Sequence, residues 1–116
     1  MAGPYADYWI STPNKVLSTT EGQIATFKAP NVVVGMVGLL QVQVHTENTN
    51  QIKAVIKINN KNVFSYGPTS TNMSRMLQAV IPSGTLLVGD NTIEGEVLSG
   101  SGSLTVVSMA IWWQAS

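Results

Sequence analysis

The sequence predicts an all-β protein, an antiparallel β-sandwich or jelly roll of about eight to ten strands. Short apolar segments alternate with polar residues, turn residues recur about every eight to twelve positions, and no window shows sustained helical periodicity. No repeat or linker divides the 116 residues. We therefore expect a single jelly-roll domain spanning residues 1–116.

The most apolar strand is expected at residues 104–113. Successive side chains of a strand point to opposite faces, and here both faces are mostly apolar. We therefore expect both to be covered, one by the domain's own core and the other by a neighbouring subunit. The expected faces are Leu104, Val106, Ser108, Ala110 and Trp112 on one side, and Thr105, Val107, Met109, Ile111 and Trp113 on the other.

Before residue 38 the strand signal is weak. Residues 1–20 are expected to be irregular and rich in aromatic side chains, with short strands near 8–11 and 15–18. Residues 23–28 alternate loosely and stop before Pro30, which lacks the amide hydrogen that a strand ladder needs. A further short strand is expected at residues 31–35.

The middle of the chain has a clear two-residue period. In residues 39–47, Leu40, Val42 and Val44 are expected to face inward, and residues 46–50 read as a polar loop. In residues 51–60, the inward row is Ile52, Ala54, Ile56 and Ile58. Residues 59–62 predict a tight turn because Asn tolerates left-handed dihedrals, and residues 63–66 form the returning strand.

The second half continues the same pattern. A hydroxyl-rich loop at residues 67–72 precedes a strand at 76–81 and a turn at 82–84. Residues 91–98 alternate, with Ile93, Gly95 and Val97 expected inside, and residues 99–103 predict a flexible turn into the last strand.

Composition excludes several function classes. Charged residues make up 10% of the chain, against roughly 25% in a typical soluble domain, and the net charge is zero. Five Lys and one Arg are too few and too scattered for a nucleic-acid surface. The longest apolar run, residues 32–40, is about half of a membrane-spanning helix. We expect a soluble chain that does not insert into membranes and has no signal peptide; whether it is exported stays open.

Catalytic and metal sites are not favoured, and we expect no cofactor. The chain has no Cys and one histidine, His45, so a metal or catalytic group would lack partners. Calcium needs a cluster of carboxylates, and only Asp90 beside Asn91 comes near. Glu94 and Glu96 share a strand face at a glycosidase-like spacing, but solvated glutamates are the simpler interpretation.

The sole arginine, Arg75, follows the hydroxyl-rich loop, and Tyr66 lies at that loop's other end. A guanidinium can hold two sugar hydroxyls while an aromatic ring covers the apolar side of a pyranose. The alternative is that Arg75 pairs with a carboxylate or a backbone carbonyl. The predicted ligand-binding residues are Tyr66, Ser70, Thr71, Asn72, Ser74 and Arg75.

The aromatic residues allow the same two interpretations. An exposed Trp can serve as a sugar platform, whereas one Trp on each face of a strand is more often core plus interface. Packing is favoured for Trp112 and Trp113, and a ligand contact stays open.

Several motifs resemble the tumour-necrosis-factor-like fucose-binding lectin domain of bacterial superlectins. They are the Phe-x-Tyr end at residues 63–66, the Ser/Thr loop, Ser74-Arg-Met76, and residues 108–112. The resemblance implies a jelly roll that assembles as a trimer, with sugar sites between neighbouring subunits. Carried over by motif, it implicates Tyr66, Ser70, Thr71 and Arg75 in contacts to a fucoside.

Residues 81–93 are similar to the linking strands of galactose-binding-like sandwiches, which occur as accessory modules of glycosidases. Together these features predict a non-catalytic carbohydrate-binding protein, a lectin that binds glycans multivalently as a homo-oligomer, with a trimer favoured. The alternative is a self-assembling structural subunit, such as a virion or appendage component, that binds no sugar.

Overall fold

The computed structural model describes residues 5–68 and 72–116, which form seven strands in an antiparallel arrangement. None of these described residues forms a helix long and apolar enough to cross a membrane. The all-β sandwich predicted from the sequence is confirmed. The strands are β1 (Tyr5–Ser11), β2 (Lys15–Val16), β3 (Gly22–Ala29), β4 (Gly38–Ile58), β5 (Lys61–Tyr66), β6 (Met73–Ile81) and β7 (Gly89–Ala115).

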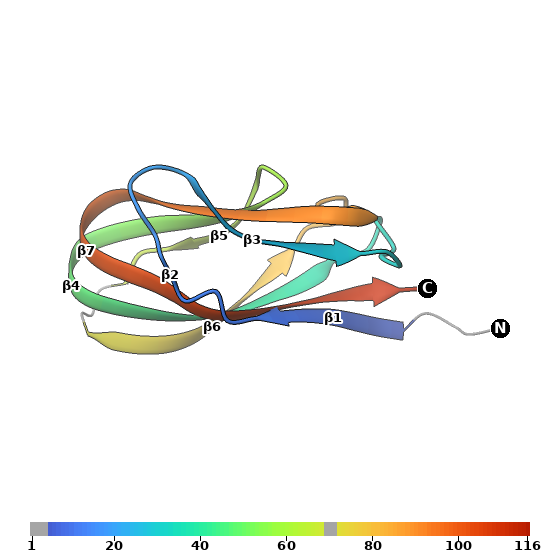
Figure 1. The fold of residues 1–116 in the computed structure, drawn as a ribbon, viewed down its shortest axis with the longest axis horizontal. Helices are drawn as coiled ribbons and strands as arrows, with labels where there is room; N and C mark the ends of the chain where they lie inside the picture. The colour runs from blue at the N-terminus through green and yellow to red at the C-terminus, as the bar shows by residue number, and fades with distance from the viewer. Residues whose placement is uncertain (1–4, 69–71) are drawn as a thin grey trace.

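The sandwich is one sheet folded over on itself (Figure 1). The long strands β4 and β7 pair antiparallel from Leu39 to Ile58 of β4, and both bend midway, so each runs through both layers. One layer, here called the β1 layer, has the order β6–β4–β7–β1, with β2 also on β7. The other, the β3 layer, has the order β5–β4–β7–β3.

The described residues form fewer and longer strands than the eight to ten predicted. Residues 46–50 and 99–103, expected as a loop and a turn, lie inside β4 and β7 and pair with each other through several register shifts. Their polar composition resembles a loop because the bend lies at the exposed end of the sandwich. Two strands of 21 and 27 residues therefore replace several short ones.

The bend depends on a very close approach of two backbones. A Cβ on Gly100 would lie 2.3 Å from the backbone oxygen of Gln51, and one on Gly102 would lie 2.5 Å from that of Asn48. Both glycines also have positive φ, 85° and 101°. Only glycine meets both requirements without strain, so these two residues fix where β7 crosses β4.

The N-terminal predictions need two corrections. The short strands expected near residues 8–11 and 15–18 are present as β1 and β2. However, β1 begins earlier, at Tyr5, and pairs in register with β7 from Met109 to Ala115, so residues 5–7 are not irregular. Residues 31–35 are not a strand: Val32 makes only an isolated bridge to Ala115, and turns surround it. In the first case the partner strand supplies the order that the local sequence lacks.

The prediction for the last strand was wrong about its two faces. Leu104 and Val106 are buried on the same side as Met109, Ile111 and Trp113. The register with β4 shifts between Gln43 and Val44, so β7 carries one extra residue there and its alternation changes parity. The bulge places most large apolar side chains of this segment in the core, and the other face is more polar than expected.

The predicted inward rows are confirmed elsewhere. The rows of β4 at Leu40, Val42 and Val44, and at Ile52, Ala54, Ile56 and Ile58, are buried between the layers. On β7, Ile93, Gly95 and Val97 are buried as expected. Asn59 and Asn60 have φ of 51° and 67° and form the tight turn between β4 and β5.

Candidate functional site

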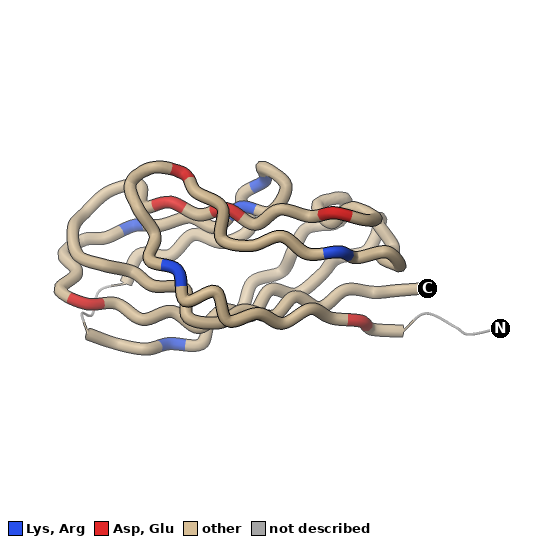
Figure 2. The backbone as a smooth tube through the Cα atoms, in the orientation of Figure 1, with Lys and Arg blue, Asp and Glu red and all other residues tan. Residues whose placement is uncertain are grey.

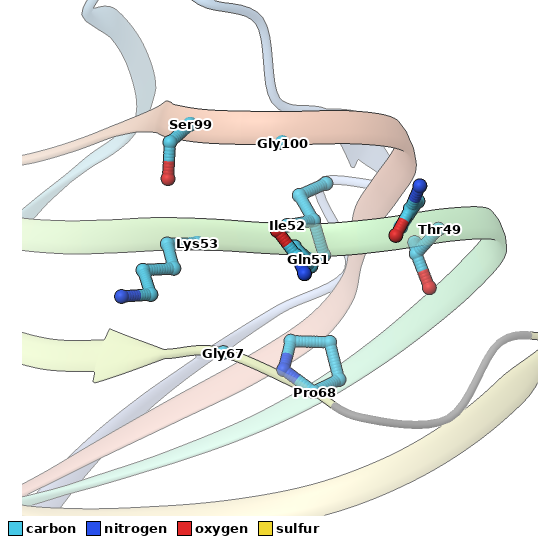
Figure 3. Close-up of a pocket in the computed structure, with 9 residues that line it drawn as sticks. Thr49, Gln51, Ile52, Lys53, Gly67, Pro68, Ser99 and Gly100 are labelled. Atoms are coloured by element: carbon cyan, nitrogen blue, oxygen red, sulfur yellow. The ribbon is translucent and has the colours of Figure 1, made fainter.

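A polar cleft opens at the bent end of the sandwich, and we call it the end cleft (Figure 3). It has a volume of about 550 Å³. The bend of β4 forms one side, β7 another, and the segment leaving β5 a third. The lining residues are Thr49, Asn50, Gln51, Ile52, Lys53, Gly67, Pro68, Ser99 and Gly100.

Local backbone geometry turns the bend's side chains toward the cleft. Asn48 and Gln51 have left-handed φ of 52° and 54°, which interrupts the regular alternation of β4. The stem of Lys53 lies beside Gly67, where an added Cβ would be 3.5 Å from Lys53 Cγ. Amide and hydroxyl side chains therefore line the opening, and such groups can hydrogen-bond a polar ligand, whereas the Lys53 side chain extends away from Gln51 and Thr49 (Figure 3).

The predicted ligand-binding residues that the structure describes, namely Tyr66, Asn72, Ser74 and Arg75, lie on or next to β5 and β6 but not on one face. Ser70 and Thr71 lie outside the described residues. Asn72 lies at the start of β6, where its Oδ1 accepts a 3.1 Å hydrogen bond from the backbone N–H of Asn48 in the bend. Asn72 thus ties the segment after β5 to the end-cleft region.

Tyr66 and Arg75 lie on the two edge strands at one side of the sandwich, and these strands contact each other. Tyr66 packs against the core, with its ring 5.9 Å from that of Phe64. Arg75 is opposite the buried Val44, so its side chain leaves β6 on the inward side. Arg75 Nη2 donates to Met73 Sδ at 3.4 Å. Among the described residues, Arg75 pairs with neither a carboxylate nor a carbonyl.

Ser74 lies on the opposite face of β6 and belongs to a different cluster. Its Oγ is 2.9 Å from Nδ1 of His45, and Nε2 of His45 is 3.1 Å from Glu47 Oε1. His45 therefore forms hydrogen bonds at the surface, in a cluster with Ser74 and Glu47.

The outward face of the β1 layer is the second notable surface, and we call it the outer face. Cross-strand register sets the members of the outer face in three rows, and none of these rows contains a charged residue; the row beyond them holds His45 and Ser74, next to Glu47. Several large apolar side chains are exposed in the three rows, including Ile10 at 59% and Met76 and Val80 at 62% each. The rows are Tyr8, Trp112, Leu39 and Val80; Ile10, Ala110, Gln41 and Gln78; and Ser108, Gln43 and Met76.

The two C-terminal tryptophans have different environments. Trp113 is buried in the core, where Nε1 donates to Asn31 Oδ1 at 3.0 Å. Trp112 is half-buried on the outer face, its ring 4.9 Å from that of Tyr8 and its Nε1 donating to Gln41 Oε1 at 2.9 Å. The prediction of packing is confirmed for Trp113, which lies in the core. The exposed part of the Trp112 side chain can contact another subunit or a ligand.

Charged residues gather on the β3 layer instead, as Figure 2 shows. Lys57 Nζ lies 2.9 Å from Glu21 Oε2 and 4.0 Å from Glu96 Oε1. The hydrogen bond from Lys57 lowers the pKa of Glu21, and the interaction with Glu21 raises the pKa of the adjacent Glu94. Glu94 and Glu96 thus belong to a surface ion-pair network that does not line the end cleft.

Asn91 has a structural role. It is fully buried, and its Oδ1 accepts hydrogen bonds of 2.8 Å from the Leu87 N–H and from Asn59 Nδ2. Because Asn91 Oδ1 already accepts from two protein donors, this oxygen is poorly placed to bind calcium. Within residues 5–68 and 72–116, no cluster of three or more His, Asp or Glu side chains could hold a metal.

No protein-family model matches the chain, and no curated protein sequence matches it. Several solved structures are similar. Dimeric latent PorU from Porphyromonas gingivalis matches with a TM-score of 0.71 at 12% identity, over 100% of this chain and 13% of that one. A β-porphyranase of glycoside hydrolase family 86 from the human gut bacterium Bacteroides plebeius has a TM-score of 0.66 at 17% identity, over 95% of this chain and 20% of that one.

The xylan-binding module CBM15 has a TM-score of 0.58 at 11% identity, over 76% of this chain and 67% of the module. At these identities, the likenesses establish the β-sandwich fold. This chain covers only 13% and 20% of the first two proteins, so its length matches a small part of each.

Sequence reasoning missed the end cleft because it assigned residues 46–50 and 99–103 to separate connections. The alternation of Gly and Ser at residues 99–103 was the available signal. Glycine spaced by one small residue suits close backbone approach inside a strand, and not only a flexible turn.

Proposed function

We propose that the protein is a non-catalytic carbohydrate-binding protein and that the end cleft is its sugar site. The observation that carries this proposal is an open cleft lined by amide and hydroxyl side chains at the end of a β-sandwich. Sugars are rich in hydroxyls that both donate and accept, and such a lining matches them. The shared fold with a xylan-binding module supports the proposal.

We further propose that the segment from Tyr66 to Arg75 completes the site, with Ser70, Thr71 and Asn72 as polar contacts; Ser74, which faces His45 on the opposite face of β6, is not part of it. Among the described residues, the guanidinium of Arg75 donates a hydrogen bond only to the sulfur of Met73, so its other donors can serve a ligand. The resemblance to a tumour-necrosis-factor-like lectin makes a fucosylated glycan the first ligand to test. In this proposal, residues 1–116 act as a single binding domain.

Absence of catalysis is part of the proposal. Glu94 and Glu96, the glutamates at glycosidase-like spacing, lie on the β3 layer. Lys57 pairs there with Glu21 and Glu96. The catalytic acid of a glycosidase needs a cleft that excludes water from one carboxyl group and so raises its pKa. Neither Glu94 nor Glu96 lines the end cleft, and a binding role needs neither.

The outer face supports a homo-oligomer, with a trimer favoured. Charged residues are depleted and Trp, Tyr and Met are enriched at the centres of protein interfaces, and the outer face has that composition. Because the face is uncharged, two copies of it do not repel each other. Linked sites then raise the effective concentration of each sugar site at a glycan-coated surface.

The test is a glycan array on the purified chain and on Arg75→Ala and Arg75→Lys variants. We expect binding to a defined glycan set, loss of about tenfold or more in Arg75→Ala, and partial recovery in Arg75→Lys. Lys28→Ala, an exposed cation on β3, is the control and should bind as the wild type does. Wild-type binding to no glycan would overturn the proposal.

The outer face also favours a second candidate function, that of a self-assembling structural subunit. In that case the apolar surface serves only contact between copies, and the end cleft has no ligand. Light scattering separates the two candidates when it is combined with the array. Large or filamentous assemblies without glycan binding favour the structural subunit, whereas a small closed oligomer with glycan binding favours the lectin.

A further inference from the structure

We propose that the end cleft selects an acidic sugar, one that bears a carboxylate or a sulfate, and that Lys53 pairs with its anionic group. This inference rests on the proposed carbohydrate-binding function and names the ligand class of that site. It stands on three features of the end cleft: its charge, the absence of an aromatic platform, and its rigid floor.

Lys53 is the one charged residue among the described residues that line the end cleft. It has no hydrogen-bond or ion-pair partner within the described part of the chain. Lys57, four residues along the same strand, is by contrast engaged by Glu21 and Glu96. The charge of Lys53 is therefore uncompensated locally, and an anion placed in the cleft gains a favourable interaction with it.

Position supports the same conclusion. The stem of Lys53 lies beside Gly67, and Figure 3 shows the side chain between β4 and the segment that leaves β5. Packing beside Gly67 steadies this stem, and the ammonium lies at the edge of the cleft, on the side away from Gln51 and Thr49 (Figure 3). The other donors of the cleft are the amides of Asn50 and Gln51 and the hydroxyl of Ser99, which suit the remaining oxygens of an anionic group.

Among the residues that the structure describes, no aromatic side chain lines the end cleft. Tyr66, next in sequence to the lining residue Gly67, turns instead toward Phe64 and the core. A neutral pyranose that enters the cleft therefore has no ring to stack on, which removes a usual source of binding energy. Charge-assisted hydrogen bonds are about twice as strong as neutral ones, so an anionic group supplies what stacking does not.

The floor of the cleft is already formed. β7 crosses β4 at Gly100 with no room for a Cβ, and Gln51 is held in a left-handed conformation. A backbone crossing this tight limits movement of the residues on either side of Lys53. Little ordering is then required when a ligand enters, which favours selectivity.

The experiment compares matched glycans that differ only in charge: a glucoside, its 6-sulfate and the corresponding glucuronide, each presented on the same carrier. The inference predicts that wild-type protein binds at least one acidic member about tenfold or more tightly than the neutral one, with affinity that falls as salt rises. The sulfate and glucuronide arms show which anion is preferred.

Lys53→Gln should lose that preference and bind all three glycans alike, and Lys53→Arg should keep it. Lys28→Gln, which removes an equal charge from β3, should leave it unchanged. Thermal melts of each variant test that the fold is intact. Lys53 is exposed, so we expect no loss of stability.

Two results would overturn the inference and leave carbohydrate binding standing. One is equal wild-type affinity for neutral and acidic members. The other is a preference for acidic members that survives in Lys53→Gln. Failure of the chain to bind any glycan, on these carriers and on a broad array, would overturn the proposed function itself.

Discussion

The close crossing of β4 and β7 can be tested with three single Gly→Ala substitutions. At Gly35 an added Cβ meets nothing within 4 Å, and φ is not positive. At Gly84 there is also open space, but φ is +81°. At Gly100 φ is +85°, and the Cβ would lie 2.3 Å from the Gln51 backbone oxygen. The series therefore separates the backbone conformation from the close approach.

The magnitudes follow from these differences. Gly35→Ala should change the free energy of unfolding by less than about 0.5 kcal/mol. Gly84→Ala should cost about 1–2 kcal/mol because a side chain disfavours the left-handed region. Gly100→Ala should cost that amount plus about 1–3 kcal/mol. The two strands must separate before the new Cβ can lie more than about 3 Å from the Gln51 backbone.

Urea denaturation followed by tryptophan fluorescence measures all three variants on one scale. Glycan binding should also fall in Gly100→Ala alone, because the end cleft is lined by the residues that must move. An unfolding free energy for Gly100→Ala equal to that for Gly84→Ala would refute the close approach. The bend and the rigid floor of the cleft would then need a different explanation.

Three further perturbations test other parts of the molecule. Asn91→Leu removes four buried hydrogen bonds and should cost about 2–4 kcal/mol in urea denaturation; a cost below about 1 kcal/mol would contradict their role. Two hydrogen bonds lower the pKa of Asp7 below its ordinary 3.8; the one from the Asn31 side chain has the larger effect and the one from the Tyr8 N–H the smaller. The ionised form of Asp7 is therefore favoured in the folded state. The stability that Asp7 adds over Asp7→Ala should be present above about pH 3.8 and lost as the pH falls through the lowered pKa; thermal melts that show a pH-independent difference would be inconsistent with this. Ala110→Lys places one unpaired charge in the outer face, and burying it in an interface should cost about 3–5 kcal/mol and so dissociate the proposed oligomer. Light scattering measures the mass; an unchanged mass would show that the interface lies elsewhere.

Local sequence was enough for much of the β-sandwich. The alternation of Leu40, Val42 and Val44 marks a buried row because a strand has a period of two wherever its ladder is regular. The tight turn at Asn59 and Asn60 was visible because few residues tolerate two left-handed conformations in succession.

What sequence reasoning missed depends on partners that are distant in the chain. The parity change in β7 arises where β4 and β7 shift register near Val44, and neither strand alone reveals it. The bend pairs Glu47 with Ser103, residues whose local composition resembles loops. The end cleft exists only where these segments meet the end of β5, so its lining could not be assembled residue by residue.

The ligand-binding prediction grouped residues of β5 and β6, whose strands contact each other, but did not foresee which face each side chain occupies. Arg75 and Tyr66 lie on contacting edge strands, whereas Ser74 points away to His45. A single register position decides which side of β6 each residue occupies, and that register is set by β4. The role of these residues in binding stays a prediction.

Binding of glycans at the end cleft can be measured by backbone amide NMR shifts during titration with the best-bound glycan. We expect saturable shifts at Gln51, Lys53, Ser99 and Gly100, and at Arg75, with little change on the outer face. Shifts centred on Trp112 and Tyr8 would place the sugar on the outer face instead, and the absence of any saturable shift would contradict sugar binding.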